Sequence, residues 1–156
     1  MIEPEEIIES GLCSALAESN LSNRIDIIGA LAPVNPGELK SAAFSCVSVT
    51  ADVSSQNIDW QEGAGLPRTY SVRVALRIPQ SDDKTGVLFR DSARIVRQTL
   101  SGFLGNGCAA LNADGFLCDA FILDSTDTAI EQMDGDAVYT KTYNITINGR
   151  YIPPAE

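Results

Sequence analysis

Two stretches of the chain alternate between apolar and polar residues, and this alternation limits the possible folds more than any other feature. Between Tyr70 and Ile78 every second residue is a large apolar one, and the residues between them include Arg73 and Arg77. Between Val138 and Tyr151, tyrosines and isoleucines alternate with threonines and asparagines. A side-chain period of two is that of a strand with one buried and one solvated face. We therefore expect a β-sheet with one apolar face.

Two further strands are predicted before Tyr70. The segment Phe44–Val53 has the same alternation, but Phe44 and Cys46 lie in the opposite phase, which suggests a bulge near Cys46. The segment Arg24–Ala30 is predicted to form a short strand.

A fifth strand is predicted over Phe116–Asp124, which is apolar in both phases except at Asp119. This pattern is typical of a strand that is buried on both faces or lies centrally in a sheet. The polar and acidic segment Ser125–Asp136 that follows is expected to be a connection between strands.

Two helices complete the predicted fold. Glu3–Glu18 has Pro4 at a first helical position and acidic residues where the helix dipole favours them. A longer amphipathic helix runs from about Thr85 to Leu104, after a capping region at Ser81–Asp83, and Gly105-Asn106-Gly107 should end it. The expected structure is one α+β domain over residues 1–156. It has a mostly antiparallel sheet of about four to five strands, with both helices packed on one face.

The net charge of −10, from 21 acidic and 11 basic residues, disfavours broad binding to nucleic acids and anionic membranes. No apolar run is long enough for a membrane helix, and the acidic N-terminus does not resemble a secretory signal. Six arginines nevertheless lie within 30 residues: Arg68, Arg73, Arg77, Arg90, Arg94 and Arg97. They are either solvated outer faces of a strand and a helix or an interface for an acidic partner.

The residue types that most enzymes use are absent or scattered. The chain has no histidine, and its four cysteines form no CxxC pair, so we predict no zinc site and reduced cysteines in the core of a cytosolic protein. A serine or cysteine nucleophile needs a neighbouring base, and Lys40, Lys84 and Lys141 are all expected to be solvated. We predict no catalytic residue, metal or cofactor.

Carboxylates are the remaining candidates for chemistry. Asp119, Asp124 and Asp127 could meet near one strand end, and Asp134-Gly135-Asp136 is a second acidic cluster, whose simplest interpretation is a surface turn. Asp119 is unusual because a charge within an apolar strand requires a partner or a wet face. An arginine of the long helix or of a neighbouring strand is the natural candidate.

The long connection Ser54–Arg68 contains the only tryptophan, Trp60, with Ile58 and Leu66 on either side. Long structured connections in compact domains are often functional. Trp60 is therefore either an aromatic anchor for a partner or a cover for the local core.

The order of these elements resembles a known family. An acidic N-terminal helix precedes a strand pair whose long loop ends in Leu66-Pro67-Arg68-Thr69-Tyr70-Ser71-Val72-Arg73-Val74. An arginine-rich helix follows, and the chain closes with Tyr139-Thr140-Lys141-Thr142-Tyr143-Asn144-Ile145-Thr146-Ile147. This arrangement, over most of the chain, is similar to the tail-terminator or tail-completion proteins of long-tailed bacteriophages and prophages. Head–tail connector proteins share much of it.

The resemblance implies a homo-oligomeric ring, commonly a hexamer, that caps the tail tube and provides the docking surface for the head. The implied partners are other copies of the chain, the tail tube protein and a head-completion or connector protein. The implied locations are the host cytoplasm during assembly and the virion tail. DNA would pass through the ring without sequence-specific binding. The Ser54–Arg68 insertion and the Val34–Ala43 connection depart from the compact members of the family.

A ring needs two different surfaces on each subunit. The acidic N-terminal helix and the arginine-rich strand and helix are candidates, together with the tryptophan loop. The residues expected at the interface are Glu5, Glu6, Glu9, Ile58, Trp60, Leu66, Arg73, Arg77, Arg94 and Arg97. Two other hypotheses remain: a module that binds a small molecule or peptide between helix and sheet, and an enzyme that uses carboxylates alone.

Overall fold

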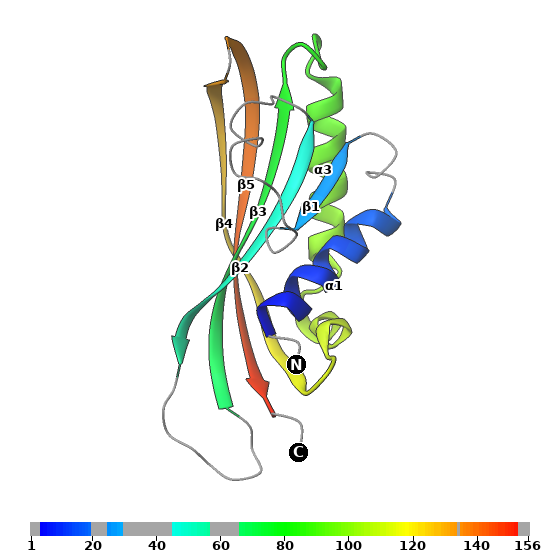
Figure 1. The fold of residues 1–156 in the computed structure, drawn as a ribbon. Helices are drawn as coiled ribbons and strands as arrows, with labels where there is room; N and C mark the ends of the chain where they lie inside the picture. Colours follow the sequence, from blue (N-terminus) through cyan, green and yellow to red (C-terminus); the bar gives the residue numbers. More distant parts are fainter. Residues whose placement is uncertain (1–3, 20–24, 30–44, 57–65, 134, 153–156) are drawn as a thin grey trace.

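A twisted sheet forms the frame of the molecule (Figure 1). The computed structural model describes residues 4–19, 25–29, 45–56, 66–133 and 135–152. Within these residues five strands pair in the order β1-β2-β3-β5-β4, and only β1 with β2 is parallel. Their bounds are β1 Asp26–Gly29, β2 Cys46–Gln56, β3 Leu66–Pro79, β4 Phe116–Met133 and β5 Asp136–Tyr151. The α+β class and the mostly antiparallel sheet are confirmed.

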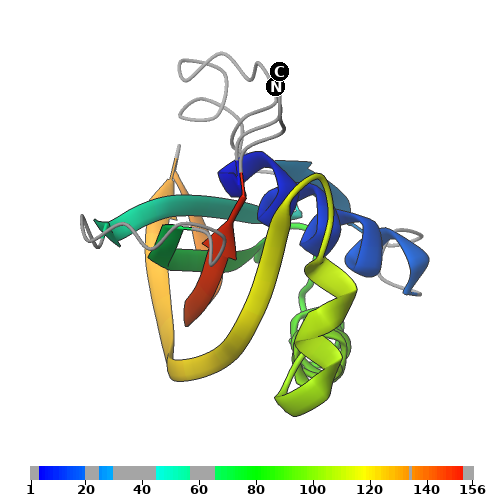
Figure 2. The same ribbon diagram turned by 90° about the horizontal axis from the view of Figure 1, so that it is seen from below.

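The two α-helices in the described residues, α1 and α3, cover the same face of the sheet, here called the inner face (Figures 1 and 2). The alternation in β3 predicts this face correctly, because its apolar residues are at most 1% exposed: Tyr70, Val72, Val74, Leu76 and Ile78. Tyr143, Ile145 and Ile147 of β5 lie opposite Val74, Val72 and Tyr70 in the ladder and are equally buried. Arg73 and Arg77 of β3, and Thr142, Asn144 and Thr146 of β5, lie in the opposite phase, on the outer face.

Helix α1 (Pro4–Glu18) forms as its sequence predicts. Ile8, Leu12 and Leu16 recur at helical spacing and are fully buried where the helix packs on β1 and β2. Gly11 lies against the 3₁₀-helix η2 (Gly105–Leu111), where an added Cβ would be 2.6 Å from Cδ2 of Leu111. An added Cβ would force the Leu111 side chain to shift, so glycine favours this close approach of α1 and η2.

Helix α3 (Val87–Ser101) is shorter than predicted at both ends. The capping region contributes Asp83, whose Oδ2 accepts a hydrogen bond of 2.8 Å from the backbone N–H of Phe89. At the other end the helix stops at Gly102, before the predicted glycines, and Gly105 and Gly107 belong to η2. Phe103 was expected within the helix because it lies at helical spacing from the other apolar residues. It lies instead in the turn between α3 and η2, where its side chain is buried.

Strand β4 is an edge strand, and the prediction of a central or doubly buried strand is wrong. Its pairing with β5 shifts register between Cys118 and Ala120, and again between Leu123 and Ser125. Each shift inserts one residue, Asp119 or Asp124, and reverses which phase faces inward. The even-numbered Phe116 and Cys118 face inward before the first bulge, whereas the odd-numbered Phe121 faces inward after it. The sequence therefore has apolar residues in both phases although only one face of the strand is buried.

The segment Ser125–Met133 continues β4 rather than forming the predicted connection. It pairs residue by residue with β5 as far as Met133 and Asp136, and Gly135 turns the chain at φ +80°. Backbone pairing holds this segment in the sheet although every described side chain from Asp124 to Gln132 is exposed. Of the acidic surface turn expected at Asp134-Gly135-Asp136, the described residues Gly135 and Asp136 lie at the end of this hairpin.

The bulge predicted near Cys46 is also misplaced. Cys46 pairs regularly with Arg77, and the register of β2 and β3 shifts instead between Val53 and Ser55. Strands β2 and β3 extend to Gln56 and from Leu66, so the expected connection Ser54–Arg68 narrows to residues 57–65. Those residues, like Phe44 and the Val34–Ala43 connection, lie outside the described part.

Candidate interaction surfaces

The outer face of the sheet is a broad polar surface. The ladders align Thr50, Arg73, Asn144 and Ser125 in one row across four strands. Asn144 Nδ2 donates hydrogen bonds of 3.1 Å to Ser125 Oγ and to Asp127 Oδ2, and the Thr146 hydroxyl donates to Asp124. This network holds the polar side chains of β4 and β5 in fixed positions, as a recognition surface requires.

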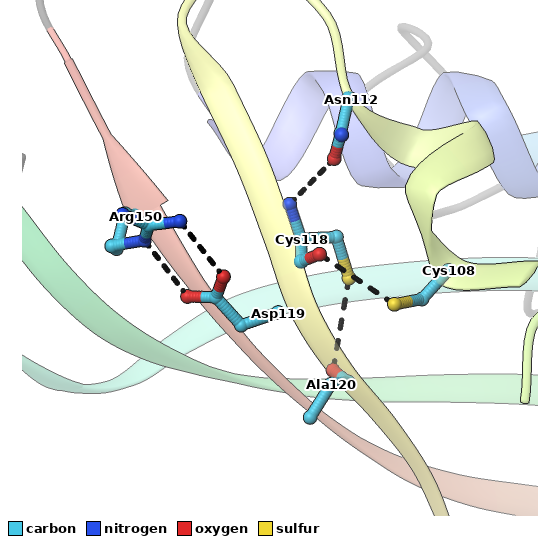
Figure 3. Close-up of polar contacts among 6 residues, drawn as sticks. All are labelled: Cys108, Asn112, Cys118, Asp119, Ala120 and Arg150. Atoms are coloured by element: carbon cyan, nitrogen blue, oxygen red, sulfur yellow. Dashed lines mark hydrogen bonds and ion pairs between the residues drawn. The ribbon is translucent and has the colours of Figure 1, made fainter. Parts of the chain in front are cut away.

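The predicted partner of Asp119 is confirmed as an arginine of a neighbouring strand (Figure 3). Arg150 of β5 donates from Nε to Asp119 Oδ2 at 3.1 Å and from an Nη to Oδ1 at 3.2 Å. The same bulge is fixed from the other side, because the N–H of Cys118 donates to Asn112 Oδ1 at 2.7 Å. Asp119, Asp124 and Asp127 each bind a different residue of β5 and do not converge on one site.

The four cysteines are free, and Cys46, Cys108 and Cys118 are buried. The Cys108 thiol donates to the carbonyl oxygen of Cys118 at 3.5 Å. Burial, reinforced by the neighbouring Cys108, raises the pKa of Cys118 to about 12, and burial raises that of Cys13 to about 11. Neither thiol is a thiolate at neutral pH, which is the form that attacks substrates. In the described residues no group of three potential ligands could hold a metal ion.

The six arginines do not form one patch, because the sheet separates them. Arg73 and Arg77 lie on the outer face, in register with Thr50 and Cys46. Arg94 and Arg97 lie on α3, on the inner side, and Arg94 Nη2 forms an exposed ion pair of 3.0 Å with Asp91. Arg68 stacks over the ring of Tyr151 at 5.7 Å.

Arg97 opens onto a cleft between α3 and the second half of β4, here called the Arg97 cleft. Its volume is about 250 Å³, and its lining residues are Arg97, Leu123, Ser125, Thr126, Lys141 and Tyr143. Tyr143 donates a hydrogen bond of 3.0 Å from its hydroxyl to the carbonyl of Ala93, and burial raises its pKa to about 12. The two cations, Arg97 and Lys141, make this cleft suited to a carboxylate.

A second hollow lies between α1 and η2, here called the α1–η2 groove. Its volume is about 290 Å³, and its lining residues are Glu6, Ile7, Ser10, Gly11, Ser14, Ala110, Leu111, Ala113 and Asp114. The apolar floor and the two exposed carboxylates suit an apolar side chain next to a cation. Glu6 belongs to this groove and Glu5 is half-buried beside it in sequence, whereas Glu9 is only 4% exposed and offers little surface.

The tryptophan loop stays a prediction. Ile58 and Trp60 lie outside the described residues, and Leu66 is described only as the start of β3, opposite Tyr151. The second half of β4 was not among the predicted surfaces. Ile130, which lies there, is 65% exposed. The signal in the sequence was Ile130 itself, an isolated large apolar residue in an acidic segment.

No helix in the described residues is long and apolar enough to span a membrane.

Comparisons with known proteins identify the fold. No family model matches the chain, and no curated protein does so either. Among solved structures, the chain is similar to a protein chain from the virion of a native gene transfer agent particle, with a TM-score of 0.57 and 14% identity. The match covers 92% of this chain and 93% of the other. Nearly the whole architecture is therefore shared.

Proposed function

We propose that this protein is a structural component of a phage-like virion, which forms a ring at the end of the tail tube and offers a docking surface to the head. The observation that carries the proposal is the fold shared with a virion chain over 92% of this chain. The order of sequence elements independently resembles tail terminators.

The surfaces of the molecule are consistent with a role in assembly. Two clefts among the described residues, the Arg97 cleft and the α1–η2 groove, are lined by groups suited to side chains of another protein. The Asp119, Asp124 and Asp127 carboxylates are each bound by a residue of β5. The surface therefore favours binding to protein over turnover of a substrate.

The charge of the chain is compatible with passage of DNA through such a ring. A subunit with a net charge of −10 repels phosphates, so a lumen lined by it would not retain the duplex. The polar outer face of the sheet, with Asp124 and Asp127 beside Thr146 and Asn144, is our candidate for the lumen lining.

Electron microscopy of the purified protein mixed with tubes of its own tail tube protein tests this proposal. We expect rings, with six subunits as the leading expectation, both free and at one end of each tube. Light scattering after size-exclusion chromatography at several salt concentrations gives the subunit number in solution. A protein that is monomeric at every concentration and leaves the tube ends bare would contradict the proposal.

A further inference from the structure

An exposed apolar patch lies at the end of the molecule where β4 and β5 form their hairpin. Ile130 is 65% exposed and lies opposite Tyr139 in the ladder, and the ring of Tyr139 is 5.6 Å from that of Phe89 in α3. Lys141 lies on the same face, opposite Thr128. These four residues, Phe89, Ile130, Tyr139 and Lys141, are called the Ile130 patch. It combines an apolar side chain that projects into solvent with a nearby cation.

The α1–η2 groove has the complementary character. Ile7 and Leu111 are 7% and 2% exposed and form an apolar floor, while Glu6 and Asp114 lie exposed at its margin. A volume of about 290 Å³ accommodates a branched aliphatic side chain. Carboxylates at the margin favour an incoming apolar group that carries a positive charge beside it.

The two surfaces lie far apart on one molecule. Figure 1 shows the β4–β5 hairpin at the top, whereas η2 and the start of α1 lie in the lower half. One molecule therefore cannot place its own Ile130 in its own groove. Two copies can do so head to tail, and such a contact leaves one patch and one groove free for further copies, which is the geometry that builds rings or filaments.

We propose that the Ile130 patch of one copy docks into the α1–η2 groove of the next, with Lys141 beside Glu6 and Asp114. The occupant is a second copy of this chain because the chain carries both complementary surfaces. The Ile130 patch is apolar with a cation beside it, and the α1–η2 groove is apolar with carboxylates at its margin. The proposal rests on the proposed function, since it supplies the contact between neighbouring subunits of the ring.

Substitution of Ile130 tests the patch. Ile130→Asp places a carboxylate against the acidic groove, and we expect subunit association, measured by sedimentation equilibrium, to weaken about tenfold or more. Ile122→Asp is the matched control, because Ile122 is on the same strand but on the outer face and is 45% exposed. The inference is overturned if both variants weaken subunit association equally, or if Ile130→Asp does not weaken it although the protein still assembles. Either result leaves the proposed function standing.

A charge exchange tests the direction of docking. Glu6→Lys should weaken association, and adding Lys141→Glu to the same chain should restore it, because the pair is then reversed. Glu18→Lys, an exposed position on α1 outside the groove, should have no effect. Additive weakening in the double variant contradicts the contact between Lys141 and Glu6.

Cross-linking separates failure of the contact from failure of the proposed function. In a Cys13→Ser background, Ser10→Cys protein is mixed with Ile130→Cys protein, both free and on tail tubes, under mild oxidation. We expect a covalent dimer in the mixture and little in either protein alone or with Ile122→Cys. Rings at tube ends without this cross-link overturn the docking inference alone. Absence of both rings and cross-link contradicts the docking and the proposed function together.

Discussion

The two halves of β4 pair with the same strand, β5, yet have different surroundings. Strand β4 contacts η2, and the inward side chains Phe116 and Phe121 of its first half, Phe116–Leu123, are 0% and 4% exposed. Ser125–Met133 continues the same ladder, but its described side chains are exposed, and Ile130 is 65% exposed. Backbone pairing is thus sufficient to order the second half, whereas side-chain burial contributes the stability of the first. We expect stability to depend on the first half and assembly on the second.

The largest difference between the halves should appear on truncation of their apolar side chains. Phe116 is fully buried and packs edge to face against Tyr70, with ring centroids 5.7 Å apart. Phe116→Ala should lower the free energy of unfolding by about 3–5 kcal/mol in urea titrations. Ile130→Ala, in the exposed half, should change it by less than about 0.5 kcal/mol. Similar losses at both positions would refute the contrast.

The close packing of the first half predicts a second, smaller effect. Gly149 lies opposite Cys118, and an added Cβ there would be 2.5 Å from Cε1 of Phe116 and 2.9 Å from the carbonyl oxygen of Leu117. Gly149→Ala should therefore cost about 1–3 kcal/mol of unfolding free energy. Thr128→Ala in the exposed half is the control, and chemical denaturation of both variants decides whether packing is confined to the first half.

Tyr143 lies near the boundary between the halves, opposite Thr126. Its hydroxyl bond of 3.0 Å to Ala93 should make Tyr143→Phe less stable by about 0.5–1.5 kcal/mol at pH 7. Burial raises the folded pKa to about 12 from the unfolded value of 10.0. The unfolded state therefore loses this proton first, so the wild type loses stability as the pH rises between these values. Denaturation at pH 7 and 10.5 should show the difference between the two proteins narrowing, and a constant difference would contradict the burial.

The smallest effect is expected at the first bulge. The Asp119 and Arg150 side chains are 45% and 43% exposed, so their ion pair is screened by water. Asp119→Ala should cost no more than about 1 kcal/mol, with the loss reduced further at high salt. A larger loss, independent of salt in thermal unfolding, would mean that the ion pair is needed to hold the bulge in place.

The contrast within β4 also explains what the sequence could and could not predict. In β3 and β5 no bulge interrupts the inward face, so alternation identifies Tyr70 or Ile147 as buried without further information. In β4, the bulges at Asp119 and Asp124 each reverse the phase of the inward side chains. A prediction that assumes a constant register therefore assigns two buried faces to a strand that has only one. The polar residues after Asp124 carry no strand signal of their own, because the order there comes from the partner strand.

Residues that are close in the sequence do not form the candidate surfaces, because folding separates neighbours and brings distant residues together. Arg77 and Arg90 are close in the chain, but the turn between β3 and α3 places them on opposite faces of the sheet. Conversely, the α1–η2 groove joins Glu6 and Asp114, which are more than a hundred residues apart. Local patterns predicted the elements, whereas the surfaces depend on how distant elements meet.

The position of β5 within the sheet has a consequence for biosynthesis. It follows the other four strands in the chain, yet it lies between β3 and β4 and pairs Leu66 with Tyr151. Before β5 leaves the ribosome, β3 and β4 each lack the neighbour that joins them, and their backbone donors are open to unwanted pairing. The sheet can therefore be completed only after β5 has been synthesised, which delays entry of the subunit into any assembly until that point.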